Sequence, residues 1–243
     1  MLRAGADEEA GLDASTRTAL HVLATHVLGR RRFEVTGRFG LRATPGGFGT
    51  PAFGEPLEVV RIAGLTLVHE VGPTSTSRSL EGATLRDLSS FVGVDLRSDF
   101  SAGADTPPTG DADRPLRLQP ATVHEIAGWF SLGWVALDGF TAGLGPAADP
   151  ATIQLWPEHF DAGSHFAMPG GHRVNIGFSA GDDVELEPYA YFAPWTPDRP
   201  GDPSFWNAPF GALVRAAEVL ADRDPVGRVI EFLETGVRNL AAT

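Results

Sequence analysis

The 243-residue sequence contains neither cysteine nor lysine, so all 19 of its basic residues are arginine. Without thiols the chain can form no disulfide, no thiolate metal site and no cysteine nucleophile. Without lysine it offers no Schiff base to pyridoxal phosphate and no phosphate-binding-loop lysine. Any chemistry must therefore use His, Asp, Glu, Arg, Ser, Thr or Tyr side chains.

Positive charge is scarce as well, because 31 acidic residues give a net charge of −12. This balance disfavours nucleic acid and anionic lipid as partners, since both are negatively charged. No run approaches the ~18 apolar residues that span a bilayer, and residues 1–13 lack the apolar segment of a signal peptide. We therefore expect a soluble, acidic, cytoplasmic protein; the sequence leaves its oligomeric state open.

Residue periodicity predicts a helix and then strands in the first part of the chain. Apolar residues at helical spacing follow the N-cap candidates Asp13 and Ser15, and Gly29 lies where a helix C-terminus favours glycine. From 33 to 41, apolar and polar residues alternate, which predicts a half-buried strand. Two further runs, 57–62 and 65–71, have hairpin spacing.

The glycine-rich residues 44–51 predict a loop, and 82–94 predict a short helix. In the second part of the chain, helical and alternating patterns are again separated by turn residues. The predicted elements there are helices at 120–140, 208–221 and 225–240, and strands at 153–161, 173–178 and 188–195.

This order predicts an α+β fold, with a mainly antiparallel β-sheet and helices packed on it. We expect a single domain covering residues 1–243. Residues 98–114 are rich in Gly, Ala, Asp, Thr and Pro, which predicts a mobile loop between the N-terminal and C-terminal halves. No internal repeat is evident.

The second half also carries a family pattern. It consists of Trp156-x-x-x-Phe160-Asp161, then Gly177-Phe178 with Gly181 nearby, then Tyr189-Ala-Tyr191 and Pro194. In these residues the chain resembles an uncharacterised bacterial family, of actinobacterial type, that has no established activity. His159 occupies a position where that family is expected to have a small residue, so the resemblance implies no shared role for His159.

Aromatic residues gather on the predicted strands of the second half. Tyr189, Tyr191 and Trp195 share one face of their strand, and Trp156 and Phe160 lie on another. Rings of this kind can form the apolar walls of a ligand pocket. They can equally belong to the core between sheet and helices, where aromatic residues are common.

Three polar residues are candidates to orient a ligand among these rings. Asp161 ends the predicted strand at 153–161. Arg38 lies on the polar face of the predicted strand at 33–41, and Arg42 continues the same face directly after it. Two arginines on one face can clamp a carboxylate or phosphate. The alternative is a solvated strand face whose arginines pair with nearby acids.

The densest group of potential metal ligands is Glu158, His159, Asp161, His165 and His172. On an extended segment His159 and Asp161 share a face, and His165 could complete a site for a divalent metal. The spacing matches no established metal motif, however. No cofactor is therefore predicted, and a metal site at His159, Asp161 and His165 is an alternative.

No motif identifies a reaction. The nucleophile elbow GxSxG is missing, and the acidic pair Asp182-Asp183 lies in a predicted turn, where acids are common for conformational reasons. The leading interpretation is a small-molecule-binding protein with an aromatic-lined pocket. The alternatives are a metal-dependent hydrolase that uses the His/Asp cluster and a structural or protein-interaction module, and the sequence does not decide whether the protein is an enzyme.

Overall fold

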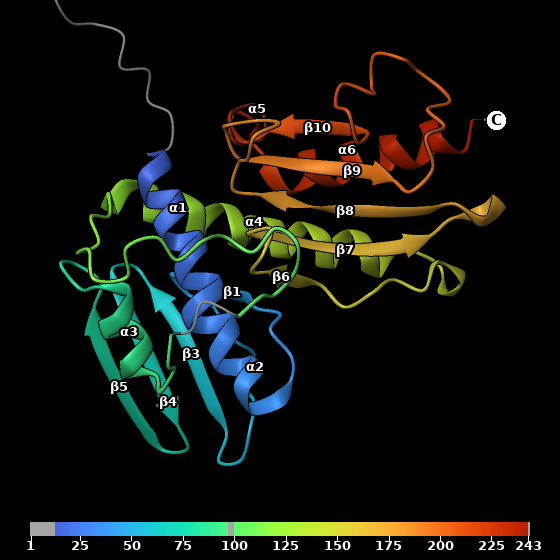
Figure 1. Ribbon diagram of the computed structural model, residues 1–243. Coiled ribbons are helices and arrows are strands. Elements are labelled where there is room, and N and C mark those ends of the chain that lie inside the picture. Colours follow the sequence, from blue (N-terminus) through green and yellow to red (C-terminus); the bar gives the residue numbers. More distant parts are fainter. Residues whose placement is uncertain (1–12, 97–99, 243) are drawn as a thin grey trace, which may run out of the picture.

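The computed structural model describes residues 13–96 and 100–242. They form two antiparallel five-stranded sheets with helices packed on each, which confirms the α+β class. Figure 1 shows the sheets side by side, with helices covering opposite sides of them in this view: α1 and α3 lie in front of the N-terminal sheet, and α4 and α6 lie behind the C-terminal sheet. Within the described residues, no helix is long and apolar enough to cross a membrane.

The N-terminal half begins with three consecutive helical segments and continues as a five-stranded meander. Its elements are α1 (Ala14–Leu23), the π-helical η1 (Ala24–Gly29), α2 (Arg30–Thr36), β1 (Arg42–Thr44), β2 (Gly47–Gly49), β3 (Glu58–Ala63), β4 (Thr66–Val71), β5 (Thr74–Ser79) and α3 (Leu85–Phe91). Asp13 caps α1, as predicted, by accepting a hydrogen bond from the backbone N–H of Thr16 at 2.8 Å. The predicted hairpin corresponds to β3 and β4.

The strand predicted at 33–41 is wrong, because the first helix does not end at Gly29. The wider π-helical turn continues directly into α2, which ends at Gly37 in the left-handed conformation (φ 71°). Phe33 and Val35 remain 40% and 44% exposed on α2, so their alternation marks no buried strand face. The loop predicted at 44–51 contains the short strand β2.

The C-terminal half likewise begins with a helix, continues as a five-stranded meander and ends in helix. Its elements are α4 (Pro120–Gly143), the 3₁₀ turn η2 (Pro146–Ala148), β6 (Gln154–Trp156), β7 (Asp161–Ala167), the turn η3 (Pro169–Gly171), β8 (Arg173–Ser179), β9 (Tyr189–Pro194), β10 (Ala212–Arg215), α5 (Ala216–Leu220) and α6 (Pro225–Leu240). The predictions of α4, α6, β8 and β9 are confirmed.

Two predictions in this half need correction. The helix predicted at 208–221 is the strand β10 followed directly by α5. The strand predicted at 153–161 ends at Trp156, because Pro157 cannot donate a ladder hydrogen bond and a turn follows it. Asp161 therefore begins the next strand, β7, instead of ending the previous one.

The two halves meet through their first strands and share α4. Leu41 and Leu155 exchange backbone hydrogen bonds of 2.7 and 2.8 Å, which join the two sheets edge to edge. The first turns of α4 belong to the core of the N-terminal half, where Phe130 packs against Phe48. The neighbouring Trp129 and the residues of the later turns belong to the second core, where Trp129 packs against Phe178.

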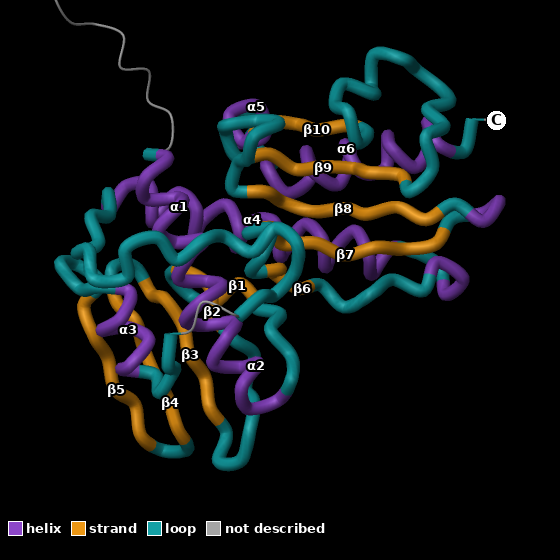
Figure 2. The backbone as a smooth tube through the Cα atoms, in the orientation of Figure 1, coloured by secondary structure: helices purple, strands orange, loops and turns teal. Residues whose placement is uncertain are grey.

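Residues 100–119 connect the halves, and Figure 2 shows this segment as a loop that passes over α1 before α4 begins. The carbonyl of Pro107 contacts Nε2 of His26 at 2.6 Å, and Phe100 lies under the guanidinium of Arg30. The segment thus packs on the N-terminal helices. Residues 98 and 99 of the loop predicted at 98–114 lie outside the described residues.

Candidate functional site

One face of the C-terminal sheet is covered by helices, and the other carries the candidate site. Ala162, Ile176 and Phe192 are fully buried on the helix side. The alternate residues point away from the helices. Across the paired strands the register aligns Asp161 with Ser179 and Tyr189, and Gly163 with Gly177 and Tyr191. β7 and β9 therefore lie on either side of β8, with their polar faces on the same side of the sheet.

Tyr191 extends from β9 across β8 toward β7 because two glycines leave room for its ring. A Cβ atom at Gly177 would lie 2.5 Å from Cζ of Tyr191, and one at Gly163 would lie 2.9 Å from its hydroxyl. The hydroxyl donates a hydrogen bond to Oδ2 of Asp161 at 2.5 Å. The glycines thus permit a tyrosine to lie on the sheet and contact an acid two strands away.

Two adjoining depressions flank this contact, with volumes of about 180 and 410 Å³. Both are lined by His159, Asp161 and Tyr191, and together we call them the Asp161 hollow. The smaller one is also lined by Ser179, Asp182, Tyr189, Ala193 and Phe210. The larger one is also lined by Ala151, Thr152, Gln154, Trp156, Glu158, Gly163, Ser164, His165 and Asn175.

Asp161 is poorly solvated although it lines the hollow. Its Oδ1 atom is shielded from solvent and has no hydrogen-bond partner among the described residues. Burial raises the pKa of the Asp161 carboxyl above its ordinary value, although the hydrogen bond from Tyr191 acts in the opposite direction. Burial and the neighbouring carboxylate also raise the pKa of Tyr191, which is therefore a neutral hydrogen-bond donor.

A second tyrosine–aspartate pair lies beside the first. The hydroxyl of Tyr189 donates to Oδ2 of Asp182 at 2.5 Å, and burial together with this bond raises the pKa of Tyr189. The rings of Tyr189 and Tyr191 are 6.2 Å apart between centroids. Phe210 stacks on Tyr189 at 6.1 Å and meets Tyr191 edge to face at the same distance. Three aromatic rings thus form one wall of the hollow.

The turn between β6 and β7 supplies the remaining acidic side chain, and N-terminal helices hold it in place. His21 contacts the carbonyl of Glu158 at 3.0 Å, and Thr25, from the buried π-helical segment, donates to the carbonyl of Pro157 at 2.7 Å. Phe160 has a positive φ of 53° and is buried in the N-terminal core, where His21 stacks on it. The N-terminal half therefore fixes the backbone at one end of the hollow.

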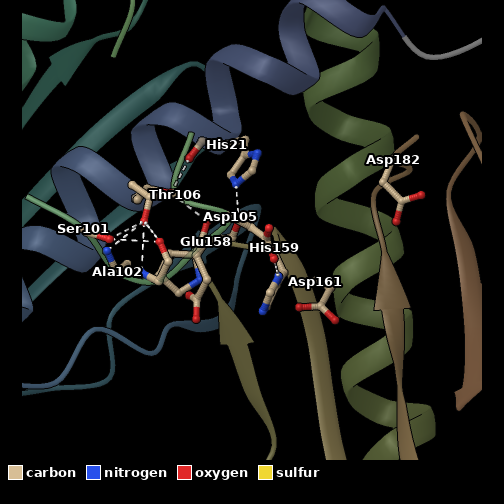
Figure 3. Close-up of polar contacts among 12 residues, drawn as sticks. His21, Ser101, Ala102, Asp105, Thr106, Glu158, His159, Asp161 and Asp182 are labelled. Atoms are coloured by element: carbon tan, nitrogen blue, oxygen red, sulfur yellow. Dashed lines mark hydrogen bonds and ion pairs between the residues drawn. The ribbon is translucent and has the colours of Figure 1, made fainter. Parts of the chain in front are cut away.

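Glu158 and His159 differ sharply in environment, and Figure 3 shows both beside Asp161. The Glu158 residue is only 7% exposed, and its Oε2 atom has no hydrogen-bond partner in the part of the chain that the structure describes. Burial raises the pKa of its carboxyl. The side chain of His159 is half-exposed, and its Nδ1 atom lies 3.2 Å from Asp105 of the connecting loop.

The structure brings together four of the six residues predicted to bind a ligand. Asp161, Tyr191, Tyr189 and Trp156 all line the hollow. Arg38 and Arg42 do not. Arg38 is exposed in the loop after α2, and the Arg42 guanidinium lies over the ring of Trp134 at 5.7 Å. The predicted strand at 33–41 does not form. Its residues belong to the end of α2 and to the loop that follows, so the two arginines lie apart from the hollow.

The predicted metal ligands do not form a metal site. Among residues 13–96 and 100–242, no group of three or more His, Cys, Asp or Glu side chains could hold a metal ion. The extended segment that would place His159 and Asp161 on one face is a turn, and His159 faces Asp105. His165 packs against Trp195, with ring centroids 5.7 Å apart.

Sequence reasoning missed several residues that line the hollow. The sequence predicts only a turn role for Asp182, and no pattern in it assigns Ser179, Asn175 or Phe210 to a binding site. The pair Gly163 and Gly177 carried a usable signal, since glycine inside a strand marks the close approach of another group. No local sequence signal marks Phe210. It contacts the tyrosines only because the loop before β10 folds back onto them.

Comparisons with known proteins add no further information. No protein-family model, no curated protein and no solved structure matches the chain. The resemblance to an uncharacterised bacterial family therefore remains a prediction that rests on the residues alone.

Proposed function

We propose that this protein binds a small molecule in the Asp161 hollow. The observation that carries the proposal is the Oδ1 atom of Asp161, a shielded acceptor without a partner among the described residues, in a residue that lines an open depression. Buried polar atoms in folded proteins are nearly always hydrogen-bonded, so such an exception calls for a ligand or ordered solvent as its partner.

The shape and composition of the hollow support the same function. Tyr189, Tyr191 and Phe210 provide an apolar wall, and Asp161, Gln154 and Asn175 add a few polar groups. Small-molecule sites combine these two features in concave surfaces of several hundred Å³. These rings are separate from the helix-covered core of the same sheet, which has its own set of buried aromatic and aliphatic residues.

A fragment screen followed by NMR tests the proposal. Fragments that bind should shift backbone resonances around Asp161 and Tyr191 and raise the melting temperature of the wild-type protein. Asp161→Ala should lose these effects. Asp138→Ala, at an exposed position on α4, is the matched control and should retain them. A broad library that shifts no resonance of the lining residues would refute the proposal.

A further inference from the structure

The charges that line the Asp161 hollow are of one sign. Three carboxylates contribute to it: Glu158, Asp161 and Asp182. None of the described lining residues is an arginine, and the only basic groups among them are His159 and His165. A net charge of −12 for the whole chain adds to the negative potential. An anionic ligand would be repelled from this surface.

Two of these carboxylates each have an oxygen that lacks a donor. Oδ1 of Asp161 and Oε2 of Glu158 are shielded from solvent and have no partner among the described residues, and Glu158 is more than nine-tenths buried. An ionised carboxyl group only accepts hydrogen bonds, so in that form each of these oxygens requires a donor as its partner. A protonated amine carries up to three N–H donors and a positive charge in one small group.

The aromatic wall suits the same ligand class. The faces of tyrosine and tryptophan rings attract a cation within about 6 Å, and the attraction increases when water is excluded. Tyr189, Tyr191 and Trp156 line the hollow next to the acids. A carbon skeleton that bears the amine can pack against these rings while its charged end reaches Asp161.

From these observations, and resting on the proposed function, we infer that the ligand is an organic ammonium ion. Its N–H groups donate to Oδ1 of Asp161, and its apolar part lies against Tyr191 and the neighbouring rings. Glu158 provides a second acceptor in the larger depression. A neutral polyol would satisfy the acceptors without neutralising the carboxylates, and it is the alternative that the experiment must separate.

Matched pairs of amines and alcohols distinguish an ammonium ligand from a neutral one. Phenethylamine is compared with 2-phenylethanol, and 1,5-diaminopentane with 1,5-pentanediol, by NMR titration of the full-length protein at low salt. Each pair keeps the skeleton and changes only the charge. We expect at least one amine to bind more than ~10-fold tighter than its alcohol, equivalent to ~1.4 kcal/mol, and to shift the resonances of Asp161 and Tyr191.

Variants then locate the preference for the amine. Asp161→Asn should reduce the ratio of amine to alcohol affinity to near one, Glu158→Gln should reduce it less, and Asp138→Asn should leave it unchanged. If the alcohols bind at the hollow as tightly as the amines, the ammonium inference is overturned while the proposed function stands. If no amine shifts the lining residues, the inference is also overturned, and the fragment screen alone then decides the proposed function.

Discussion

Each half of the molecule buries carboxylates, but in opposite environments. In the N-terminal half, Glu58 is 5% exposed and receives hydrogen bonds from Arg31 at 2.7 and 2.9 Å and a contact from His69 at 2.9 Å. In the C-terminal half, Asp161 and Glu158 each keep a shielded oxygen without a partner among the described residues. Both halves contain a five-stranded antiparallel meander, so the difference lies in the side chains that surround each acid.

The pKa directions follow these environments. Burial alone would raise the pKa of Glu58, but the bonds from Arg31 and His69 outweigh it and lower that pKa. At Asp161 burial dominates and raises the pKa. A buried carboxylate with a cation beside it stabilises the fold only together with its partner, whereas one without a cation reduces stability. The comparison therefore separates an acid that is held by a cation from acids that have none beside them.

The largest loss of stability is expected when Arg31, the cation that holds Glu58, is removed. Arg31→Ala should lower the free energy of unfolding by about 3 kcal/mol, because it leaves the charge of Glu58 buried without its bidentate donor. Urea denaturation measures this value. The control is Arg61→Ala on the same sheet, whose contact with Glu70 is 3.5 Å long and partly exposed, and which should cost under ~1 kcal/mol. Equal costs for the two variants would show that the Glu58 pair is not structural.

The second effect concerns the glycine that makes room for Tyr191. Gly177→Ala should displace the tyrosine ring, lower the free energy of unfolding by about 1–3 kcal/mol and abolish fragment binding at the hollow. Gly128→Ala is the control, because a Cβ atom there meets nothing within 4 Å and an α-helix gains up to ~1 kcal/mol from alanine. If Gly177→Ala keeps both stability and binding, Tyr191 has no role in shaping the site.

A smaller effect is expected from the tyrosine hydroxyl itself. Tyr191→Phe removes the donor to Asp161, so it should cost ~1 kcal/mol of unfolding free energy and raise the pKa of Asp161 further. The pKa is measured by NMR titration of the carboxyl resonance. Tyr189→Phe, which removes the donor to Asp182, should change the pKa of Asp161 much less. An unchanged pKa in Tyr191→Phe would contradict the assigned contact.

Parts of the fold with a strong buried pattern were predictable from the sequence. The apolar face of α4 and the alternation in β8 and β9 each correspond to a covered surface. The strand β5 carries no such signal, since all six of its residues are exposed and polar. Residues 33–41 show alternation without a strand, because the π-helical turn changes which residues face the core.

The candidate site was predictable to a similar extent. Tyrosines two residues apart on a strand, with an acid in a nearby segment, indicated Asp161, Tyr189 and Tyr191 as a group, and the structure places all three at one depression. The contributions of Glu158 and Phe210 depend on a turn held by the N-terminal helices and on the long loop between β9 and β10. Local sequence patterns carry no information on such tertiary placements.

The pH dependence of stability tests the contrast between the halves most directly. Free energies of unfolding are measured for wild type, Asp161→Asn and Glu58→Gln from acidic to neutral pH. The folded-state pKa of Asp161 is raised, so its contribution to stability falls as pH rises through that pKa, and Asp161→Asn should gain on wild type toward neutral pH. The folded-state pKa of Glu58 is lowered, so Glu58→Gln should lose most at neutral pH and least in acid. If the difference in unfolding free energy from wild type changed with pH in the same direction for both variants, the two acids would not lie in opposite environments.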